Sequence, residues 1–210
     1  ETGAAGLTAA ISAADSGDCV LITDAAVGKS NSIMAQGGLQ LPFPTEASQQ
    51  SFYEDIVRSA RVELDTALVK NFVAHVAETI QCLEEWGLAL DRQDDGELVR
   101  RLAGGLSEPR IVSVRDQIGP AIVKVLRVHV QEACDVDILD HTKVVDIIPD
   151  GAIFRLLLEG RKGERSELRA RAVIGCTGGN TFHSAQAQQH PTTNPANDNH
   201  VFFDVLQRLG

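Results

Sequence analysis

Several features that would mark the class of this 210-residue chain at once are missing. Basic residues are not in surplus, because 29 Asp and Glu against 19 Lys and Arg give a net charge of −10. Nucleic acids and anionic membranes select clustered Lys and Arg, so neither is expected as a partner. No apolar run approaches the length of a membrane-spanning helix. The sequence also shows no leader segment, which would consist of a basic stretch followed by an apolar stretch. We therefore expect a soluble, cytoplasmic protein without direct membrane insertion.

Motifs for metals and disulfides are absent as well. The chain has four cysteines, each in an apolar stretch and none in a CxxC pair, so we expect reduced thiols in the core. His183, His190 and His200 lack the short spacing that places metal ligands on one helical face. We therefore expect solvated loop histidines and no metal site. The cysteines are Cys19, Cys82, Cys134 and Cys176.

An apolar strand is missing ahead of the first motif. In a dinucleotide-binding unit, a strand leads into a glycine turn, and the next helix presents its N-terminus to the pyrophosphate. The sequence opens instead with ETGAAGLTAAISAADSGDCVLITD, which supplies the turn, the helix and the following strand. An absent central strand would leave backbone groups and an apolar layer uncovered. We expect that the sequence begins inside a longer protein, or that another segment or chain replaces the strand.

The elements that are present follow an informative order. Apolar residues at three- and four-residue spacing predict helices from about Ser48 to Leu90, and IGPAIVKVLRVHVQEA continues this pattern. The stretches VDILDHTKVVDII, GAIFRLLLEG and RARAVIGC are typical of strands and are separated by glycine-containing turns. This order is typical of a two-segment flavin-binding domain. We expect one incomplete domain over 1–210, with dinucleotide and flavin loops (1–40), a helical insertion (48–130), a strand meander and return strand (136–179), and a loop and helix (180–210).

Two stretches offer groups for a nucleotide. Gly3 and Gly6 match the second and third glycines of G-x-G-x-x-G, with Glu1 at the first position, and Asp24 ends the next strand, where an acid can bind ribose hydroxyls. Alternatively, GAAG is a helix of small residues and Asp24 only begins a turn. The second stretch, KSNSIMAQGG, supplies hydroxyls, an amide and two glycines that allow close approach of a flat ring. Its alternative is a polar surface loop.

Four stretches in this order, GAAGLTAAISA, SNSIMAQGG, AGGLSEPR and AVIGCTGGN with TTNP, resemble the flavoprotein subunits of succinate dehydrogenase, fumarate reductase and L-aspartate oxidase. The resemblance covers essentially the whole chain. It implies an α/β, Rossmann-like FAD-binding domain that lacks its first strand and its capping domain. It also implies flavin-dependent oxidation or reduction of a small dicarboxylate-like acid by the full-length protein. An iron–sulfur electron-transfer subunit is an implied partner, through which the protein would be peripheral to a membrane.

The resemblance also implies roles for individual residues. Gly3, Gly6 and Asp24 would hold the pyrophosphate and ribose. Residues within 30–38 would line the flavin. Thr177 and Gly178 would lie on the adenosine side of the cofactor. Val145, or its neighbour Val144, lies in the strand that passes the adenine. The implied cofactor-binding residues are Gly3, Ala5, Gly6, Asp24, Ser30, Asn31, Ser32, Gln36, Gly37, Gly38, Val145, Thr177 and Gly178.

Departures from the family pattern limit what the resemblance implies. Asn31 stands where covalently flavinylated members carry histidine, and an amide cannot form that bond, so FAD would bind noncovalently. Leu106 stands where the family motif GGHS has its histidine. The stretch NPANDNH stands where the family has TGDG, whose aspartate region contacts the ribityl chain of the flavin, and Asp198 is the candidate substitute for that contact. In the family, a capping domain that follows this point supplies the proton-donating arginine, so the resemblance implies that this arginine lies outside the stretch given. No catalytic residue is therefore named, and Arg110 and Arg115 are expected in surface or salt-bridge roles.

Two other hypotheses stay open at this stage. The first is a binding module that holds FAD or another adenine dinucleotide without turnover, which Glu1 and NPANDNH favour. The second is a degenerate fragment without a ligand. Under the family interpretation, we expect the 210-residue chain alone to be inactive.

Overall fold

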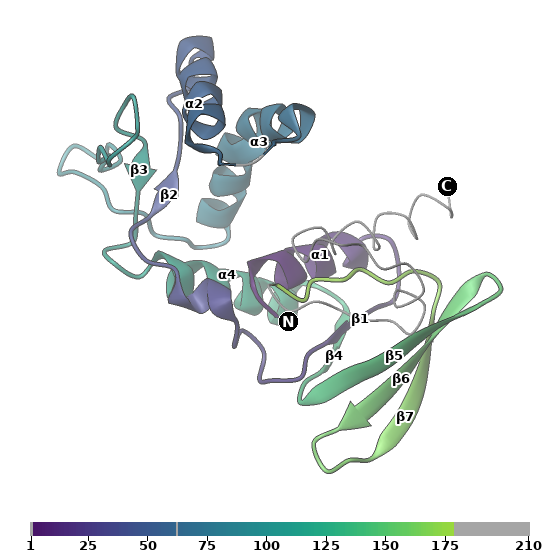
Figure 1. Ribbon diagram of the computed structural model, residues 1–210. Coiled ribbons are helices and arrows are strands. Elements are labelled where there is room, and N and C mark those ends of the chain that lie inside the picture. Colours follow the sequence, from purple (N-terminus) through teal and green to yellow (C-terminus); the bar gives the residue numbers. More distant parts are fainter. Residues whose placement is uncertain (1, 62, 179–210) are drawn as a thin grey trace. The chain divides into compact units, whose positions relative to one another are not determined.

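The computed structural model describes residues 2–61 and 63–178, which form parts of two compact units (Figure 1). Unit 1 comprises Glu1–Asn31 and Arg127–Gly210, and unit 2 comprises Ser32–Leu126. The boundary between the units falls within helix α4 (Ile118–Ala133). The loop and helix expected at 180–210, with His183, His190, Asp198 and His200, lie outside the described residues.

Unit 1 contains a helix and a pair of parallel strands. Helix α1 (Ala4–Ala14) forms because small apolar residues favour a helix, and it buries Gly6, Leu7 and Ala10. It contacts strand β1 (Cys19–Ile22), which pairs in parallel with β4 (Val136–Leu139), so that Cys19 lies opposite Val136. The predicted helix, turn and strand at the start of the chain are confirmed.

Unit 1 also contains an antiparallel three-stranded sheet in the order β5-β6-β7. Its strands are β5 (Thr142–Asp150), β6 (Ile153–Gly160) and β7 (Arg165–Ala170). Gly151 and Gly163 occupy the turns between them with positive φ angles of 65° and 80°, as the turn signals predict. Alternate residues of β6 are buried and form one core cluster, made of Phe154, Leu156 and Leu158.

The return strand forms only in part. The sequence predicts a strand over RARAVIGC, which spans residues 169–176, but β7 ends at Ala170 and residues 171–177 belong to no strand. A strand persists by exchanging backbone hydrogen bonds with a neighbour. The described residues supply no such neighbour for this segment.

In unit 2, helices α2 and α3 form within the stretch from Ser48 to Leu90 where the sequence predicts helices. Thr45 caps α2 (Glu46–Ser59) by accepting from the N–H of Ser48, and Asp65 caps α3 (Thr66–Glu85) by accepting from two N–H groups. A small antiparallel pair joins β2 (Leu39–Gln40) to β3 (Ile111–Val112), and a 3₁₀ turn, η1 (Asn31–Met34), precedes β2. Helix α3 buries one stripe of residues, namely Val73, Val76, Ile80 and Leu83.

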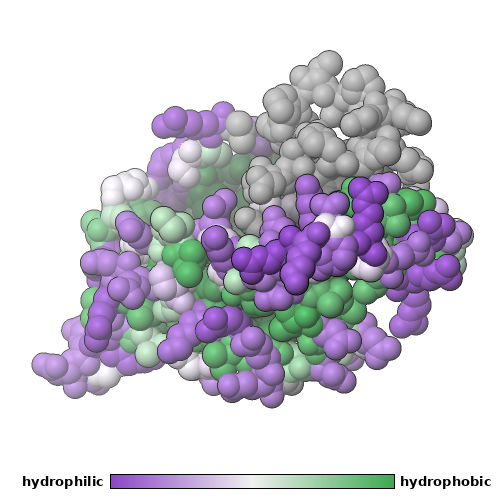
Figure 2. Space-filling model, turned by 90° about the horizontal axis from the view of Figure 1, so that it is seen from below, coloured by the Kyte–Doolittle hydropathy of each residue, from purple (hydrophilic) through white to green (hydrophobic). Residues whose placement is uncertain are grey.

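Hydrophilic side chains cover much of the face in Figure 2, with smaller groups of apolar side chains between them. Within 2–61 and 63–178, no helix is both long and apolar enough to cross a bilayer. The same residues contain no group of His, Cys, Asp and Glu side chains that could hold a metal ion.

Candidate functional site

The start of α1 and the end of β1 meet at the buried side chain of Thr2. Its Oγ1 accepts a hydrogen bond from the N–H of Gly28 (2.9 Å) and donates one to Oγ1 of Thr23 (3.5 Å). Thr23 follows β1 directly, and Gly28 belongs to the loop that continues from it. Thr2 therefore fixes that loop beside the N-terminus of α1. This residue was not predicted from the sequence, although a hydroxyl just ahead of a helix is a signal for it.

The N-terminus of α1 has no side-chain cap. Gly3 is the N-cap residue, with extended backbone angles, and it supplies no side chain to cap the helix. The first turn carries no acidic residue, and Gly3 and Gly6 are buried while Ala5 is exposed. Backbone N–H groups at a helix start, together with the helix dipole, attract phosphate groups. The two predicted glycines therefore lie where a pyrophosphate would be favoured.

Two polar residues follow β1 in the same unit. Asp24 is exposed and comes directly after the buried Thr23. The Oγ of Ser30 is buried and has no hydrogen-bond partner among the described residues. A buried hydroxyl without a partner is rare in a native structure, and a polar ligand is one explanation for it. The helix start, the carboxylate and this hydroxyl fit the phosphates and hydroxyls of a dinucleotide.

Asn31, the exposed first residue of η1, ends the first segment of unit 1, and the residues of the predicted flavin loop from Ser32 onward belong to unit 2. Ser32 lies in η1, and Gln36 and Gly37 are exposed. Gly37 has a positive φ of 87°, and its carbonyl accepts from Nη2 of Arg101 (2.8 Å).

Gly38 is required by packing. Its φ is 154°, and a Cβ atom there would lie 2.4 Å from the carbonyl oxygen of Val112 in β3. Gly119 in α4 is similar, since a Cβ there would lie 2.3 Å from the carbonyl oxygen of Ser32. The sequence analysis missed Gly119. These two glycines allow backbone segments of unit 2 to approach each other closely.

The residues predicted on the adenosine side lie in unit 1. Val145 is the extra residue of a β-bulge, because its neighbours Val144 and Asp146 pair with Leu158 and Leu157. A bulge re-aims a side chain, and that of Val145 is 40% exposed. Thr177 is half-buried, and Gly178 has a positive φ of 67°.

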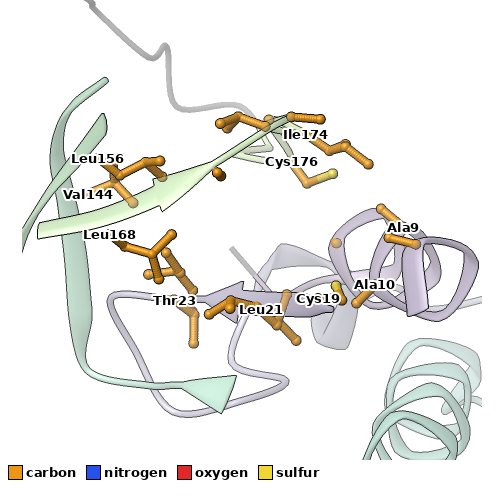
Figure 3. Close-up of a pocket in the computed structure, with 18 of the residues that line it drawn as sticks. Ala9, Ala10, Cys19, Leu21, Thr23, Val144, Leu156, Leu168, Ile174 and Cys176 are labelled. Carbon is orange, nitrogen blue, oxygen red and sulfur yellow. The ribbon is translucent and has the colours of Figure 1, made fainter. Parts of the chain in front are cut away.

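A cavity of about 1000 Å³ lies within unit 1 and includes Gly6, Asp24 and Thr177 in its lining. Figure 3 shows side chains converging on it from α1, β1, the three-stranded sheet and the segment after β7. Most of the labelled side chains are apolar, and Cys19 and Cys176 are among them. Burial raises the pKa of both thiols. Apolar side chains of this kind offer few hydrogen bonds to a pyrophosphate.

The GGLSEPR stretch of unit 2 contains Arg110, which belongs to a cluster of buried charged side chains. Arg110 is fully buried, forms an ion pair with Asp55 of α2, and donates to Oε1 of Glu108 (2.8 Å). Its guanidinium also lies over the ring of Phe52, 5.1 Å from the centroid, and burial lowers its pKa. The predicted salt-bridge role of Arg110 is confirmed, and its side chain is not on the surface. Arg115 has a positive φ of 50°, and its N–H donates to Asp91 (2.7 Å).

Comparison with known proteins adds to this geometry. The sequence matches the family described as FAD binding domain over residues 2–199. It is 30% identical to L-aspartate oxidase of Synechocystis sp. over 196 residues, which cover 92% of this chain and 34% of the relative. It is 26% identical to L-aspartate oxidase of Clostridium acetobutylicum over 152 residues, covering 72% and 35%. The chain thus spans about a third of the length of these curated relatives.

Comparison with solved structures indicates the same type of flavoprotein. A variant of the FrdA chain of E. coli quinol fumarate reductase superposes with a TM-score of 0.77 at 27% identity, covering 84% of this chain and 31% of that one. The Mycobacterium smegmatis Sdh1 complex in the apo form has a TM-score of 0.72 at 23% identity, covering 81% and 32%, which shows the fold alone. The predicted Rossmann-like α/β fold and family are confirmed. The chain belongs to the FAD binding domain family, as a flavoprotein of the succinate dehydrogenase, fumarate reductase and L-aspartate oxidase type.

Proposed function

We propose that the full-length protein is an FAD-dependent oxidoreductase that oxidises or reduces a small dicarboxylate-like acid. One observation carries the proposal: the start of α1 without a side-chain cap, the carboxylate of Asp24 and the buried hydroxyl of Ser30 that has no partner among the described residues occur in one unit, where Thr2 bonds to the loop after β1. Helix-start N–H groups favour a pyrophosphate, and an acid after the second strand favours ribose hydroxyls. The similarity to L-aspartate oxidases and to a quinol fumarate reductase supports the substrate class.

The residues of this chain would bind and orient the cofactor. FAD itself supplies hydride transfer. Gly3 and Gly6 let the backbone approach the phosphates, and Asp24 accepts from the ribose hydroxyls. The hydroxyls of Ser30 and Ser32, the amide of Gln36 and the open backbone at Gly37 offer hydrogen bonds and space to the flavin ring. Val145, Thr177 and Gly178 would contact the adenosine half.

The manner of FAD binding is part of the proposal. The amide of Asn31 cannot form a histidyl–flavin bond, so FAD would be held noncovalently, and the interactions above would have to retain it. The family resemblance implies that the group that exchanges a proton with the substrate belongs to a capping domain. An iron–sulfur subunit is the proposed electron partner, through which the enzyme would be peripheral to a membrane.

Two aspartates that flank β1 allow a matched test of cofactor binding. Asp24 follows the strand and Asp18 precedes it, and both are exposed. Hydrogen bonds to a charged group contribute about 1.5–3 kcal/mol, so Asp24→Ala in the full-length protein should weaken FAD binding roughly 10- to 100-fold. Asp18→Ala should leave it unchanged. Flavin fluorescence gives the affinity, and acid precipitation should release all the flavin from the wild-type protein. Equal affinity in both variants, or flavin retained in the pellet, would contradict these assignments.

Turnover separates the enzyme from a binding module. The full-length protein is incubated with succinate or L-aspartate and an artificial electron acceptor, or with fumarate and a reduced dye. We expect turnover of at least one of these acids. A protein that binds FAD tightly but converts none of them would favour the alternative of a noncatalytic FAD-binding module.

A further inference from the structure

The turn at the start of the predicted flavin loop rests on the first turn of α4. The N–H of Ala35 donates to the carbonyl of Ser32 (3.2 Å), which closes the turn. The N–H of Gly119 then donates to the carbonyl of Ala35 (3.1 Å). Gly119 is the second residue of α4, where backbone N–H groups have no acceptor within the helix. The turn therefore supplies an acceptor that the start of this helix needs.

The contact at Gly119 leaves no room for a side chain. A Cβ atom there would lie 2.3 Å from the carbonyl oxygen of Ser32 and 2.9 Å from both the nitrogen and the oxygen of Ala35. All three are backbone atoms, so no change of a side-chain rotamer could relieve the overlap. Any residue larger than glycine would have to move the turn away from α4.

The end of the same loop packs on strand β3. A Cβ atom on Gly38 would lie 2.4 Å from the carbonyl oxygen of Val112 and 2.7 Å from Cγ2 of Ile111. Arg101 adds a third contact, because its Nη2 donates to the carbonyl of Gly37 (2.8 Å) while its backbone exchanges two hydrogen bonds with Ile111. Residues 32–38 are thus held at both ends by one continuous stretch, 111–119, with Arg101 beside it.

Asp91 anchors the part of this stretch that connects β3 to α4. The N–H of Asp91 donates to the carbonyl of Ser113 (2.8 Å). Its Oδ2 accepts from Oγ of Ser113 (3.0 Å) and from the N–H of Arg115 (2.7 Å). Ser113 is also buried. The loop therefore takes its position from a support that is fixed by its own hydrogen bonds.

The other side of the loop is open among the described residues. Gln36 and Gly37 are exposed, and Met34 is 74% exposed. A Cβ atom on Gly37 would meet no described atom within 4 Å, in contrast to one on Gly38. A loop that is already ordered loses less conformational freedom when a ligand binds. Packing on one side and open space on the other therefore favour binding of a flat ring.

We propose that Gly119 and Arg101 are positioning residues for the flavin. Gly119 seats the turn at 32–35 on α4, Arg101 fixes the carbonyl of Gly37, and the loop is thereby formed before the ring binds. Both residues act through the backbone of the loop, not by contact with the flavin. This inference rests on the proposed function and deepens it, because it assigns the position of the flavin loop to two residues outside that loop.

Two matched pairs of variants in the full-length protein test this proposal. Gly119→Ala is compared with Gly104→Ala, where a Cβ atom would meet no described atom within 4 Å. Arg101→Ala is compared with Arg92→Ala, because Nη1 of Arg92 also donates to a glycine carbonyl, that of Gly96 (2.9 Å), outside the flavin loop. Calorimetric titration of each apoprotein measures the affinity for FMN, which carries the flavin, and for ADP, which carries the adenosine half.

The two ligands separate positioning from a general structural role. We expect Gly119→Ala to weaken FMN binding about tenfold or more, and Arg101→Ala to weaken it about three- to tenfold. ADP binding should be unchanged in both, because a general loss of stability would weaken both ligands. The two control variants should bind both ligands as the wild-type protein does. In the apoprotein, Gly119→Ala should also speed hydrogen exchange at 32–38 and leave α2 and α3 unchanged.

Each outcome decides the proposal. Selective loss of FMN affinity in Gly119→Ala and Arg101→Ala supports it. Unchanged FMN affinity, or equal losses for FMN and ADP in a folded variant, would overturn it. If faster exchange throughout α2 and α3 shows that Gly119→Ala does not fold, Arg101→Ala decides by the same criteria. A wild-type apoprotein that binds ADP but no flavin would overturn the proposed function and this inference with it, whereas failure in the variants alone would leave the proposed function standing.

Discussion

Arg110 carries a full charge in a fully buried site, and its surroundings explain why this is tolerated. Asp55 supplies the opposite charge and also accepts from the N–H of Ser107 (2.8 Å), so one carboxylate serves both the arginine and the glycine loop before it. Glu108 and Ser51 accept from Nη1 of Arg110, whereas its buried Nε has no partner among the described residues. A buried charge is stable only when such partners satisfy it. The cluster therefore fixes the loop at 104–110 onto α2.

Removing one partner of this pair should be costly. Asp55→Ala leaves Arg110 charged, buried and without its main partner, so we expect a loss of about 3–5 kcal/mol in the free energy of unfolding. The matched control is Glu84→Ala, which breaks an ion pair with Arg92 at the surface (2.7 Å) and should cost about 0–1 kcal/mol. Urea unfolding, followed by the far-UV circular dichroism of the helices, measures both. Similar losses in the two variants would show that the buried pair has no special role.

At the scale of an element, β6 shows how the sheet of unit 1 is held together. Its side chains alternate, so that Leu156 is buried in the core cluster while the adjacent Leu157 faces the other side and is only half-buried. The pairs of β6 with β5 and β7 fix this register. Because a shift by one residue would exchange the two faces, the alternation also specifies the pairing.

This alternation yields a prediction that two neighbouring leucines can test. Leu156→Ala removes a buried side chain and leaves a cavity, which should lower the free energy of unfolding by about 2–5 kcal/mol. Leu157→Ala removes the same atoms from the other face and should cost clearly less. Thermal or urea unfolding of both variants gives the comparison. Equal losses would contradict the assignment of the core to the face that carries Leu156.

The elements also show what sequence patterns can and cannot specify. Caps, periodicity and turn glycines are local, so the sequence predicted α1, α2, α3 and the strands β5 and β6 correctly, whereas β7 (Arg165–Ala170) overlaps the predicted strand at 169–176 by only two residues. The stretch at 171–177 has the composition of a strand, but pairing needs a partner that the described residues do not supply. Arg110 and Asp55 are far apart in the sequence, and no local pattern indicates that they meet. The hydrogen bonds of Thr2 to Thr23 and Gly28 are equally nonlocal.

At the scale of the whole molecule, the residues predicted to bind the cofactor are divided between the two units. The helix start, Asp24, Val145 and Thr177 lie in unit 1, whereas Ser32, Gln36 and the paired glycines lie in unit 2. The sequence predicted the family from the order of these motifs, and the family comparison confirms it. The assignment of individual residues to parts of the cofactor stays a prediction. FAD has a flavin half and an adenosine half, so a comparison with a ligand that has only the flavin half can test which residues bind the adenosine half.

Ligand-induced stabilisation of the full-length protein provides this test. FAD and FMN share the flavin, but only FAD carries the adenosine half that we assign to unit 1. A ligand that binds only the folded state at 100 times its Kd stabilises it by about 2.7 kcal/mol, so excess FAD should raise the melting temperature of the apoprotein by several degrees. FMN at the same concentration should raise it much less. Asp24→Ala should lower the shift with FAD toward that with FMN and leave the shift with FMN unchanged. Equal shifts with both flavins in the wild-type protein would show that the adenosine half contributes nothing, and the assignments at the start of α1 and at Asp24 would then be wrong.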